Sequence, residues 1–346
     1  MSENPLVIIG AGQAGLATAR TALRRGVRPV VLESAGEPGG SWPHYYDSLT
    51  LFSPSRFAAL PGMALPGAGD RYPGRDEVVE YLRRYAARLD ADIRVNHRVK
   101  RLEPGNGALT AVTDDGERLD ARAVVVATGG FGRPHIPTLA GMGGFFGHVL
   151  HAAEYRSPEP FAGQRVVIVG GGNSAVQIGV ELASVADVTL ATRRPISWMP
   201  QRPLGRDMHW WFTRTGLDSA PLGSLWHRLP PSVLDDGHQR EAVEAGRPDR
   251  RPLFTRVTAD GVEWSDGTRE PVDTLLLATG YRPAVDFLEG TPALDDDGAP
   301  RHRNGVSTTV PGLGYVGLEF QRSFSSATLR GVGRDARHVL GRLGLR

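Results

Sequence analysis

Residues 6–26 read "LVIIGAGQAGLATARTALRRG" and join an apolar run to an alanine-rich run through three glycines. The apolar run predicts a buried strand, and the alanine-rich run predicts a helix over about 14–25. Gly10, Gly12 and Gly15 form the G-x-G-x-x-G pattern between them. In this context the glycines allow a tight turn, a close approach of a pyrophosphate and close packing of the helix on the strand. The stretch therefore predicts a dinucleotide-binding unit.

The strand after this helix, "PVVLE", ends at Glu33, eighteen positions beyond Gly15. A carboxylate at the end of this strand can accept hydrogen bonds from both hydroxyls of a ribose. We therefore expect the first unit to prefer a nucleotide whose ribose hydroxyls are free.

A second copy of the pattern occupies residues 165–183, "RVVIVGGGNSAVQIGVELA", in which Gly170 and Gly172 are followed by Ala175. Alanine is small enough for the third glycine position. The next strand, "DVTLATRRP", is closed by Arg193 and Arg194 instead of an acid. Arginine accommodates a 2′-phosphate with charge-assisted hydrogen bonds, so this unit favours NADP. The alternative is that the two arginines only form a solvated strand end.

Two further segments repeat each other, "ARAVVVATGGFGRP" (121–134) and "VDTLLLATGYRP" (272–283). Each has an apolar strand, then Ala-Thr-Gly, then Arg-Pro. Strands so uniformly apolar are buried on both faces. We interpret the pair as crossings between a first domain and an inserted second domain.

Taken in order, these motifs resemble the flavin-dependent monooxygenases with two dinucleotide-binding domains, in particular the short bacterial members and the auxin-forming plant members. Further matching segments are "GGSW" (39–42), "FFGHVLHAAEY" (145–155) and "GLEFQRSFSSATLRGVGRDA" (317–336). The resemblance spans about residues 5–340. It implies an α/β fold with two Rossmann-like domains. The FAD-binding domain would comprise residues 1–152 and 276–346, and the NADPH-binding domain, 153–275, would be inserted in it.

The resemblance also implies the activity. NADPH would reduce FAD, and the reduced flavin would activate O2 as a C4a-(hydro)peroxide that oxygenates a small organic substrate. Two alternatives remain open: an NADPH oxidase or flavin reductase that transfers no oxygen, and a non-catalytic FAD-binding sensor module. An oxidase or reductase would not accumulate the flavin (hydro)peroxide. A sensor module would not consume NADPH.

The same resemblance implies a set of cofactor-binding residues. For FAD they are Gly10, Gly12, Gln13, Ala14, Gly15, Glu33, Gly40, Ser41, Trp42, the backbone of Val99 near the adenine, and the helix start at Thr328 and Leu329 near the flavin ring. For NADPH they are Gly170, Gly172, Asn173, Ser174, Ala175, Arg193 and Arg194. The Ala-Thr-Gly exits add Thr128, Gly129, Thr279 and Gly280.

Two residues are candidates for a catalytic role. His151 lies in the family fingerprint Phe145-x-Gly147-x-x-x-His151-x-x-x-Tyr155. Histidine titrates near neutral pH, but a role in coupling the two domains is the stronger interpretation. The tyrosine points away from the Baeyer–Villiger branch, where a tryptophan would stand. Ser53 occupies the region in which many members have an asparagine beside the flavin, and its alternative role is that of a turn residue.

Residues 196–252 carry four of the six tryptophans, Trp198, Trp210, Trp211 and Trp226. They could form a lid over the flavin, a homodimer surface or a membrane-touching patch. The simplest interpretation is a small helical subdomain packed on its own aromatic residues.

Composition excludes several classes. The 346 residues contain no cysteine, which excludes disulfides, thiolate zinc sites and a redox-active cysteine pair. We expect no metal site. The net charge of +2 and the absence of basic runs argue against a nucleic-acid partner. The apolar runs are far shorter than the roughly 20 residues of a membrane span, and the N-terminus does not resemble a signal peptide, so we expect a cytoplasmic protein.

Overall fold

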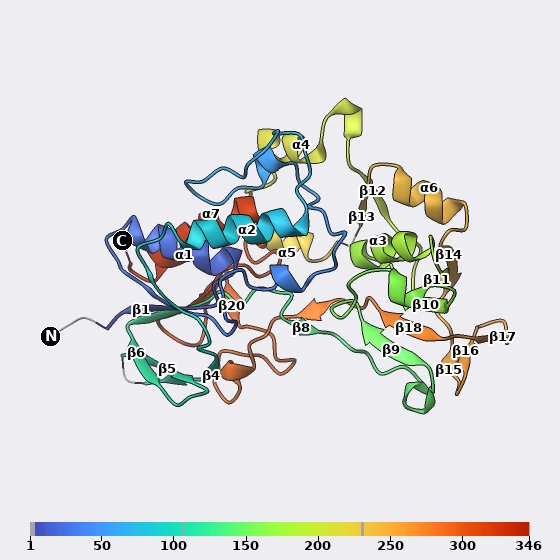
Figure 1. The fold of residues 1–346 in the computed structure, drawn as a ribbon. Coiled ribbons are helices and arrows are strands. Elements are labelled where there is room, and N and C mark those ends of the chain that lie inside the picture. The colour runs from blue at the N-terminus through green and yellow to red at the C-terminus, as the bar shows by residue number, and fades with distance from the viewer. Residues whose placement is uncertain (1–3, 106, 230–231, 346) are drawn as a thin grey trace.

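The computed structural model describes residues 4–105, 107–229 and 232–345, and its framework is two largely parallel sheets (Figure 1). The first sheet has seven strands in the order β20-β21-β22-β7-β1-β2-β3. The five strands from β22 to β3 are parallel, and β21 and β20 continue the sheet as an antiparallel edge. Their bounds are β1 Leu6–Ile9, β2 Val30–Leu32, β3 Asp92–Arg94, β7 Ala123–Val126, β20 His302–Arg303, β21 Val306–Ser307 and β22 Leu313–Tyr315.

Both faces of the first sheet are covered, which explains the uniformly apolar strand at its centre. Successive side chains of a strand point to opposite faces. Leu6 and Ile8 of β1 pack under the helices, whereas Val7 and Ile9 pack against a three-stranded meander on the other face. The helices are α1 Gln13–Leu23, α2 Arg75–Ala86 and α7 Leu329–Arg342, and the meander is β4 Val99–Pro104, β5 Leu109–Thr113 and β6 Arg118–Ala121.

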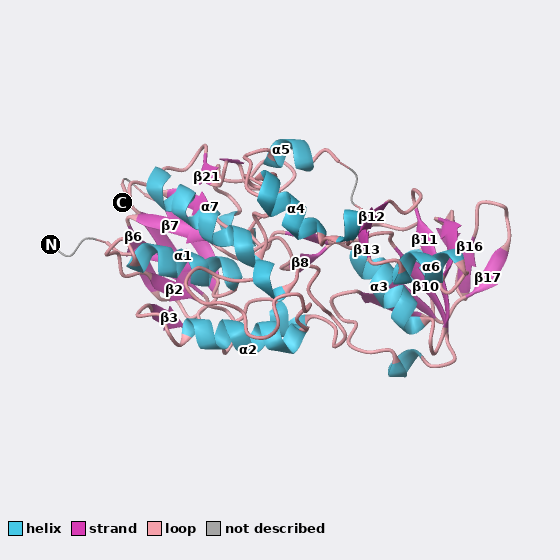
Figure 2. Ribbon diagram, turned by 90° about the horizontal axis from the view of Figure 1, so that it is seen from above, coloured by secondary structure: helices cyan, strands magenta, loops and turns pink. Residues whose placement is uncertain are grey.

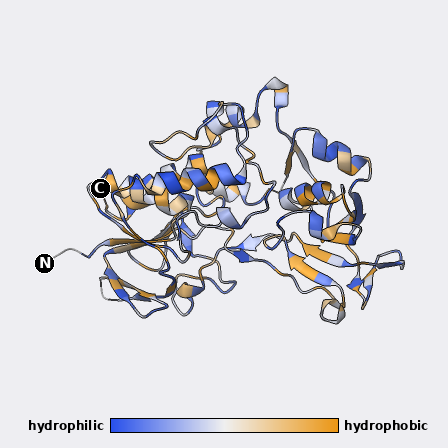
Figure 3. Cartoon of the chain, viewed as in Figure 1, coloured by the Kyte–Doolittle hydropathy of each residue, from blue (hydrophilic) through white to orange (hydrophobic). Residues whose placement is uncertain are grey.

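The second sheet has five parallel strands in the order β14-β11-β10-β18-β9. Val166 and Ile168 of β10 face the side of α3, and Val167 and Val169 face a small antiparallel sheet. Figure 3 shows β18 of this sheet as hydrophobic and α6 as mostly hydrophilic, and the edge strand β14 has the polar sequence Asp-Arg-Arg-Pro. The bounds are β9 His148–His151, β10 Arg165–Val169, α3 Asn173–Leu182, β11 Asp187–Thr192, α6 His238–Glu244, β14 Asp249–Pro252, β18 Thr274–Leu277, and β15 Arg256–Val257, β16 Gly261–Glu263 and β17 Arg269–Pro271 in the small sheet.

The chain crosses between the two sheets as a short antiparallel pair, β8 (Arg133–Pro134) with β19 (Tyr281–Arg282). The two Arg-Pro segments that the sequence singled out as crossings are therefore hydrogen-bonded to each other. The expected boundary after residue 152 does not follow the hydrogen bonding, because β9 pairs with β18 inside the second sheet. The polypeptide changes sheet before β9, near β8.

Residues 196–252 do not form the self-contained helical subdomain that was the simplest interpretation. They include a parallel strand pair, β12 (Trp198–Pro200) with β13 (Val233–Asp235), in addition to α4 (Met208–Thr215), α5 (Gly223–Trp226) and α6. Figure 2 shows β12 and β13 beside α3, whereas α4 and α5 lie toward α7. The segment thus reaches from the second sheet to the first. Within the described part of the chain, no helix has the length and apolar character needed to cross a membrane.

Candidate functional site

The first glycine loop follows β1 directly and requires close backbone approaches. A β-carbon added at Gly15 would lie 1.8 Å from the carbonyl oxygen of Gly10, and one added at Gly10 would lie 2.9 Å from that of Ala127. Gly12 is the N-cap of α1 and has no side chain to fill the space in front of the helix. The exposed amides and the positive end of a helix make such a place suited to a phosphate group.

Glu33 lies just beyond β2, is 5% exposed, and is held by backbone amides. Its Oε2 accepts from the amide of Ala11 at 2.7 Å, and its Oε1 accepts from that of Ala35 at 2.9 Å. The hydroxyl of Ser34 also donates to Oε1 at 3.2 Å, so Oε2, with one partner in the described ranges, can accept a second hydrogen bond. The amide of His97 donates to the Glu33 carbonyl at 2.8 Å, which brings the start of β4 at Val99 to this end of the loop.

Gln13 joins three segments that are far apart in the sequence. Its Nε2 donates to the carbonyl of Ala327 at 2.5 Å, and its Oε1 accepts from Nε1 of Trp42 at 3.0 Å. Thr328, the N-cap of α7, and Leu329, its first residue, follow directly. The beginnings of α1 and α7 and the turn around Trp42 therefore meet, as the predicted FAD contacts require.

The residues around this junction fit a flavin dinucleotide. A β-carbon at Gly40 would lie 2.8 Å from the Cα of Gly12, and one at Gly129 would meet no atom within 4 Å, so bare backbone lines the loop. Within the described ranges, Oγ1 of Thr128 is buried without a hydrogen-bond partner. A buried hydroxyl of this kind is costly unless something binds it. The remaining predicted residues lie in the same elements: Ala14 in α1, and Ser41 directly before the 3₁₀ turn Trp42–His44.

The second glycine loop repeats this geometry at the end of β10. A β-carbon at Gly170 would lie 2.4 Å from the carbonyl oxygen of Ala278, and Gly172 is the N-cap of α3. Ala175 is buried against the strand. Asn173 and Ser174 open the helix, and Oδ1 of Asn173 accepts from the amide of Leu234 in β13 at 3.0 Å. The start of α3 is thereby tied to the 196–252 segment.

Arg193 and Arg194 follow β11 and are both exposed. Beside them lies a surface hollow whose lining includes Ile196, Trp198 and Arg250. Nε of Arg250 donates to Oγ1 of Thr192 at 3.0 Å, so a third guanidinium stands near the end of β11. Three guanidiniums thus stand at this end of the second loop, in contrast to the carboxylate that closes the first, although Glu244 and Asp249 also line the hollow.

His151 ends β9 and is 2% exposed. Its Nδ1 accepts from the amide of Ala153 at 3.1 Å, so the proton is assigned to Nε2, which donates to the carbonyl of Gly280 at 3.1 Å. Burial lowers the pKa of His151. Both ring nitrogens thus have backbone partners, and the ring packs edge-on to Tyr281 of the crossing strand. Oγ1 of Thr279 donates to the carbonyl of His135 at 2.5 Å, a second bond across the same join.

Ser53 is buried and lies in the loop between β2 and α2. Within the described ranges it forms no hydrogen bond with the glycine loops or α7. Its neighbour Phe52 accepts, through its carbonyl, a hydrogen bond from Nε2 of Gln201 at 3.0 Å. The structure therefore ties this loop to the 196–252 segment and gives Ser53 itself no partner in either loop.

Comparisons with known proteins agree with this geometry. The family model described as pyridine nucleotide-disulphide oxidoreductase matches residues 7–204. The chain belongs to this family. Since the sequence has no cysteine, dithiol chemistry is excluded for it.

The similar proteins are flavin monooxygenases and oxidoreductases. The indole-3-pyruvate monooxygenase YUCCA1 of rice is 32% identical, over 96% of this chain and 89% of that protein. An uncharacterized CzcO-like oxidoreductase of Geobacillus kaustophilus is 31% identical over 97% of each chain. The structure of a flavin-containing monooxygenase from Stenotrophomonas maltophilia matches 99% of each chain with a TM-score of 0.87 and 32% identity. The protein is thus an enzyme of the flavin-dependent monooxygenase and oxidoreductase group.

Sequence reasoning missed two aspartates of the 196–252 segment, Asp207, whose side chain is 11% exposed, and Asp218, whose side chain is 1% exposed. Oδ2 of Asp207 accepts from the hydroxyl of Tyr72 at 2.5 Å and from Nε2 of Gln201 at 2.6 Å, and its Oδ1 lies 2.7 Å from Nδ1 of His209. Burial opposes ionisation of this carboxyl, but these hydrogen bonds outweigh it and lower the pKa of Asp207 to about 2. The other aspartate, Asp218, contacts α7. Their partners are distant in sequence, so no local pattern reveals them.

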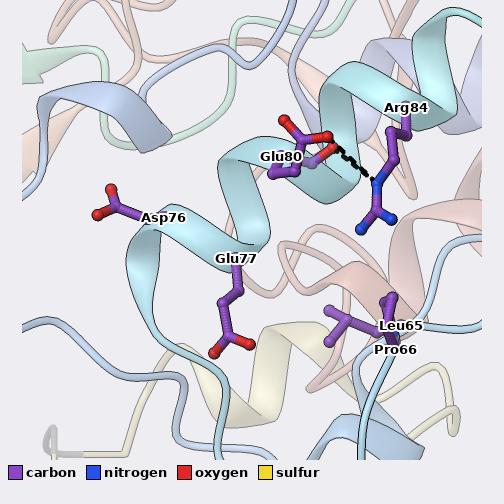
Figure 4. Close-up of a pocket in the computed structure, with 6 residues that line it drawn as sticks. All are labelled: Leu65, Pro66, Asp76, Glu77, Glu80 and Arg84. Atoms are coloured by element: carbon purple, nitrogen blue, oxygen red, sulfur yellow. Dashed lines mark hydrogen bonds and ion pairs between the residues drawn. The ribbon is translucent and has the colours of Figure 1, made fainter.

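A separate surface hollow beside α2 does not belong to this site (Figure 4). Three of its side chains are carboxylates, one of which, Glu80, pairs with Arg84 at 3.4 Å on the same helix. It shares no residue with either glycine loop. Its lining consists of Leu65, Pro66, Asp76, Glu77, Glu80 and Arg84.

Proposed function

We propose that this protein is an NADPH-dependent flavin monooxygenase that uses FAD and O2 to oxygenate a small organic substrate. The observation that carries the proposal is the opposite charge at the ends of two otherwise similar glycine loops. Glu33 suits a ribose with free hydroxyls, and Arg193 with Arg194 suits a 2′-phosphate. One chain therefore offers one site suited to FAD and another suited to NADPH.

In the first site, the amides of Gly12 and of the first turn of α1 would bind the pyrophosphate, and Glu33 would hold the ribose of the adenosine. The Gln13 junction would fix Trp42 and the start of α7 around the ring. When bound, FAD would supply the oxygen-activating chemistry after reduction by NADPH. The protein would orient the ring and exclude water from it.

In the second site, the start of α3 with Asn173 and Ser174 would bind the NADPH pyrophosphate. Arg193 and Arg194 would hold the 2′-phosphate, and the hollow next to them would accept the adenosine. We interpret His151 as a residue that couples the two sites, because both its ring nitrogens are engaged with backbone. A chemical role for Ser53 has no support from a polar contact.

We also propose two Rossmann-like domains with revised boundaries. The amide of Val257 donates to the carbonyl of Ala140 at 2.8 Å, and that of Phe146 to the carbonyl of Ala259 at 2.8 Å. These bonds join the segment before β9 to the small sheet next to β18. The NADPH domain would therefore begin just after β8 and end just before β19.

A cytoplasmic location stays a prediction.

The test is rapid mixing of the reduced FAD protein with O2, with NADP⁺ present. We expect an absorbing species distinct from oxidised and reduced flavin, and NADPH consumption in excess of hydrogen peroxide release when a substrate is added. Indole-3-pyruvate belongs in the substrate panel because the rice relative is named for it. Direct reoxidation with stoichiometric peroxide would indicate an oxidase, and a lack of flavin bleaching by NADPH would indicate a binding module.

A further inference from the structure

The segment between α4 and α5 is attached to the start of α7 by a buried ion-pair cluster. Asp218 is 1% exposed, and its Oδ1 accepts from Nε of Arg330 at 2.8 Å. Its Oδ2 accepts from Nη2 of Arg334 at 2.5 Å. Burial opposes ionisation, but the two guanidiniums outweigh it and hold the pKa of Asp218 below its ordinary value. One carboxylate thus compensates two cations on the first turns of one helix.

Hydrogen bonds to backbone carbonyls extend the contact between this segment and the turn before α7. The carbonyl of Asp218 accepts from the hydroxyl of Ser325 at 2.8 Å, and the amide of Gly223 donates to the carbonyl of Arg322 at 3.0 Å. A β-carbon at Gly223 would lie 1.9 Å from the carbonyl oxygen of Phe320, so the backbones of the two segments are in direct contact there. The docked segment leaves no room for a shift of the 320–328 turn toward α5.

Aromatic packing completes the contact. The ring of Phe324 lies 4.9 Å from that of Phe212 in α4 and 5.0 Å from that of Trp226 in α5. Rings at this spacing and in edge-on arrangements add about 1 kcal/mol per pair beyond their burial. The turn that leads into α7 is therefore fixed from the side of α4 and α5 by both polar and apolar contacts.

The other side of this turn belongs to the proposed flavin site. Ala327 accepts the hydrogen bond from Gln13, and Thr328 caps the helix. The positive end of α7 would stabilise negative charge on the reduced flavin ring, an effect that weakens within one helical turn. Small shifts of this end would therefore change the flavin's chemistry.

We propose that Asp218 is a positioning residue for the flavin: by pairing with Arg330 and Arg334 it holds α4 and α5 against α7 and fixes the helix end that faces the ring. This inference rests on the proposed function, because it assumes FAD in the first site. Removing one partner of a buried ion pair leaves uncompensated charge, so the effect of losing Asp218 should be large.

The experiment compares Asp218→Asn, which keeps the shape and removes the charge, with Asp218→Glu, which keeps the charge. We measure the FAD midpoint potential, the FAD dissociation constant and the KM for NADPH. For Asp218→Asn we expect a more negative potential, because displacement of the helix end opposes and exceeds the effect of losing a nearby negative charge, which alone would make the potential more positive. FAD binding should weaken on the order of tenfold, with the KM for NADPH within about twofold of the parent. Asp218→Glu should recover part of both losses.

Asp235→Asn is the matched control. It is a buried carboxylate of the same segment, and its Oδ1 accepts from the amides of Gln239 at 3.0 Å and Arg240 at 3.3 Å and not from α7. The inference is overturned if folded Asp218→Asn keeps the parent potential and FAD affinity, or if the control shifts the potential equally. Should Asp218→Asn not fold, Arg334→Lys keeps the charge and shortens the reach to Asp218 from a side chain that is 31% exposed. It must shift the potential in the same direction by less, and an unchanged potential overturns the inference.

The two proposals fail differently. If the parent protein neither retains FAD nor is bleached by NADPH, the proposed function fails and takes this inference with it. If the parent does both and the Asp218 variants match it in potential and FAD affinity, only the positioning role fails.

Discussion

The two glycine loops have similar backbones and different surroundings. In both, a buried strand leads to a glycine packed against the carbonyl after a neighbouring strand, Ala127 in the first loop and Ala278 in the second. The first loop is closed by Glu33, which is buried and bonded to backbone amides. The second is closed by Arg193, which is exposed. On the proposed function, the turn would set where a pyrophosphate sits, and the closing side chain would set which nucleotide is accepted.

The third position of the pattern differs as well. Gly15 has no room for a β-carbon because the carbonyl oxygen of Gly10 is in the way. Ala175 carries a β-carbon at the same place in the second loop and is buried. The helix of the first loop therefore starts closer to its strand than the helix of the second, and the first loop should be the less tolerant of substitution.

The largest expected effect is that of Gly15→Val. The added side chain overlaps backbone that cannot move without shifting α1, so we expect a loss of about 3 kcal/mol or more in the free energy of unfolding, and loss of bound FAD. Urea unfolding and the flavin content of the purified protein measure this. The matched change in the second loop, Ala175→Gly, should cost about 1 kcal/mol. Equal losses would remove the distinction between the loops.

Glu33→Gln should come next. The amide keeps one acceptor oxygen, but its NH2 group must face the amide of Ala11 or that of Ala35, which leaves a buried donor unpaired. We expect a loss of about 2 kcal/mol in FAD binding, or roughly thirtyfold in the dissociation constant, followed by fluorescence titration. The KM for NADPH should stay unchanged. An unaltered FAD affinity would show that Glu33 only supports the loop.

Arg193→Ala tests the second loop. Losing a charge-assisted contact to the 2′-phosphate should raise the KM for NADPH about tenfold and that for NADH less than about twofold. Steady-state kinetics with both nucleotides measures the ratio. Arg88→Ala, at an exposed arginine on the side of the first sheet, is the control and should leave both values unchanged. A parallel rise for NADPH and NADH would refute the 2′-phosphate role.

The smallest expected effect concerns His151, at the join of the two halves. Burial lowers the pKa of His151 in the folded state below its ordinary value of 6.5, so at lower pH the unfolded state binds the proton more readily. Its contribution to stability is therefore full above pH 6.5 and declines as the pH falls. Between pH 7 and 5 the parent should therefore lose more of its free energy of unfolding than His151→Gln does. Urea unfolding at a series of pH values measures this, and parallel profiles of the parent and His151→Gln would contradict it. The other buried histidines are present in both proteins, so their contributions cancel.

The sequence by itself determined the elements that depend on local chemistry. Apolar strands buried on both faces and glycines at tight turns follow from patterns within a few residues, as β1 and β10 show. The start of α7 at Thr328 and Leu329 was implied only by the family resemblance. The sequence also predicted the opposite charges of Glu33 and Arg193 at the ends of the two loops, because each residue stands at a fixed offset from a glycine pattern.

Only the tertiary structure decided which contacts connect the two sheets. β9 belongs to the second sheet because its partner β18 lies more than a hundred residues away, and no local signal states which sheet a lone short strand will enter. The contacts of Asp218 with α7 and of Asp207 with Tyr72 are likewise pairings across the chain. The choice of partner depends on how the whole chain packs, and sequence spacing carries no information about it.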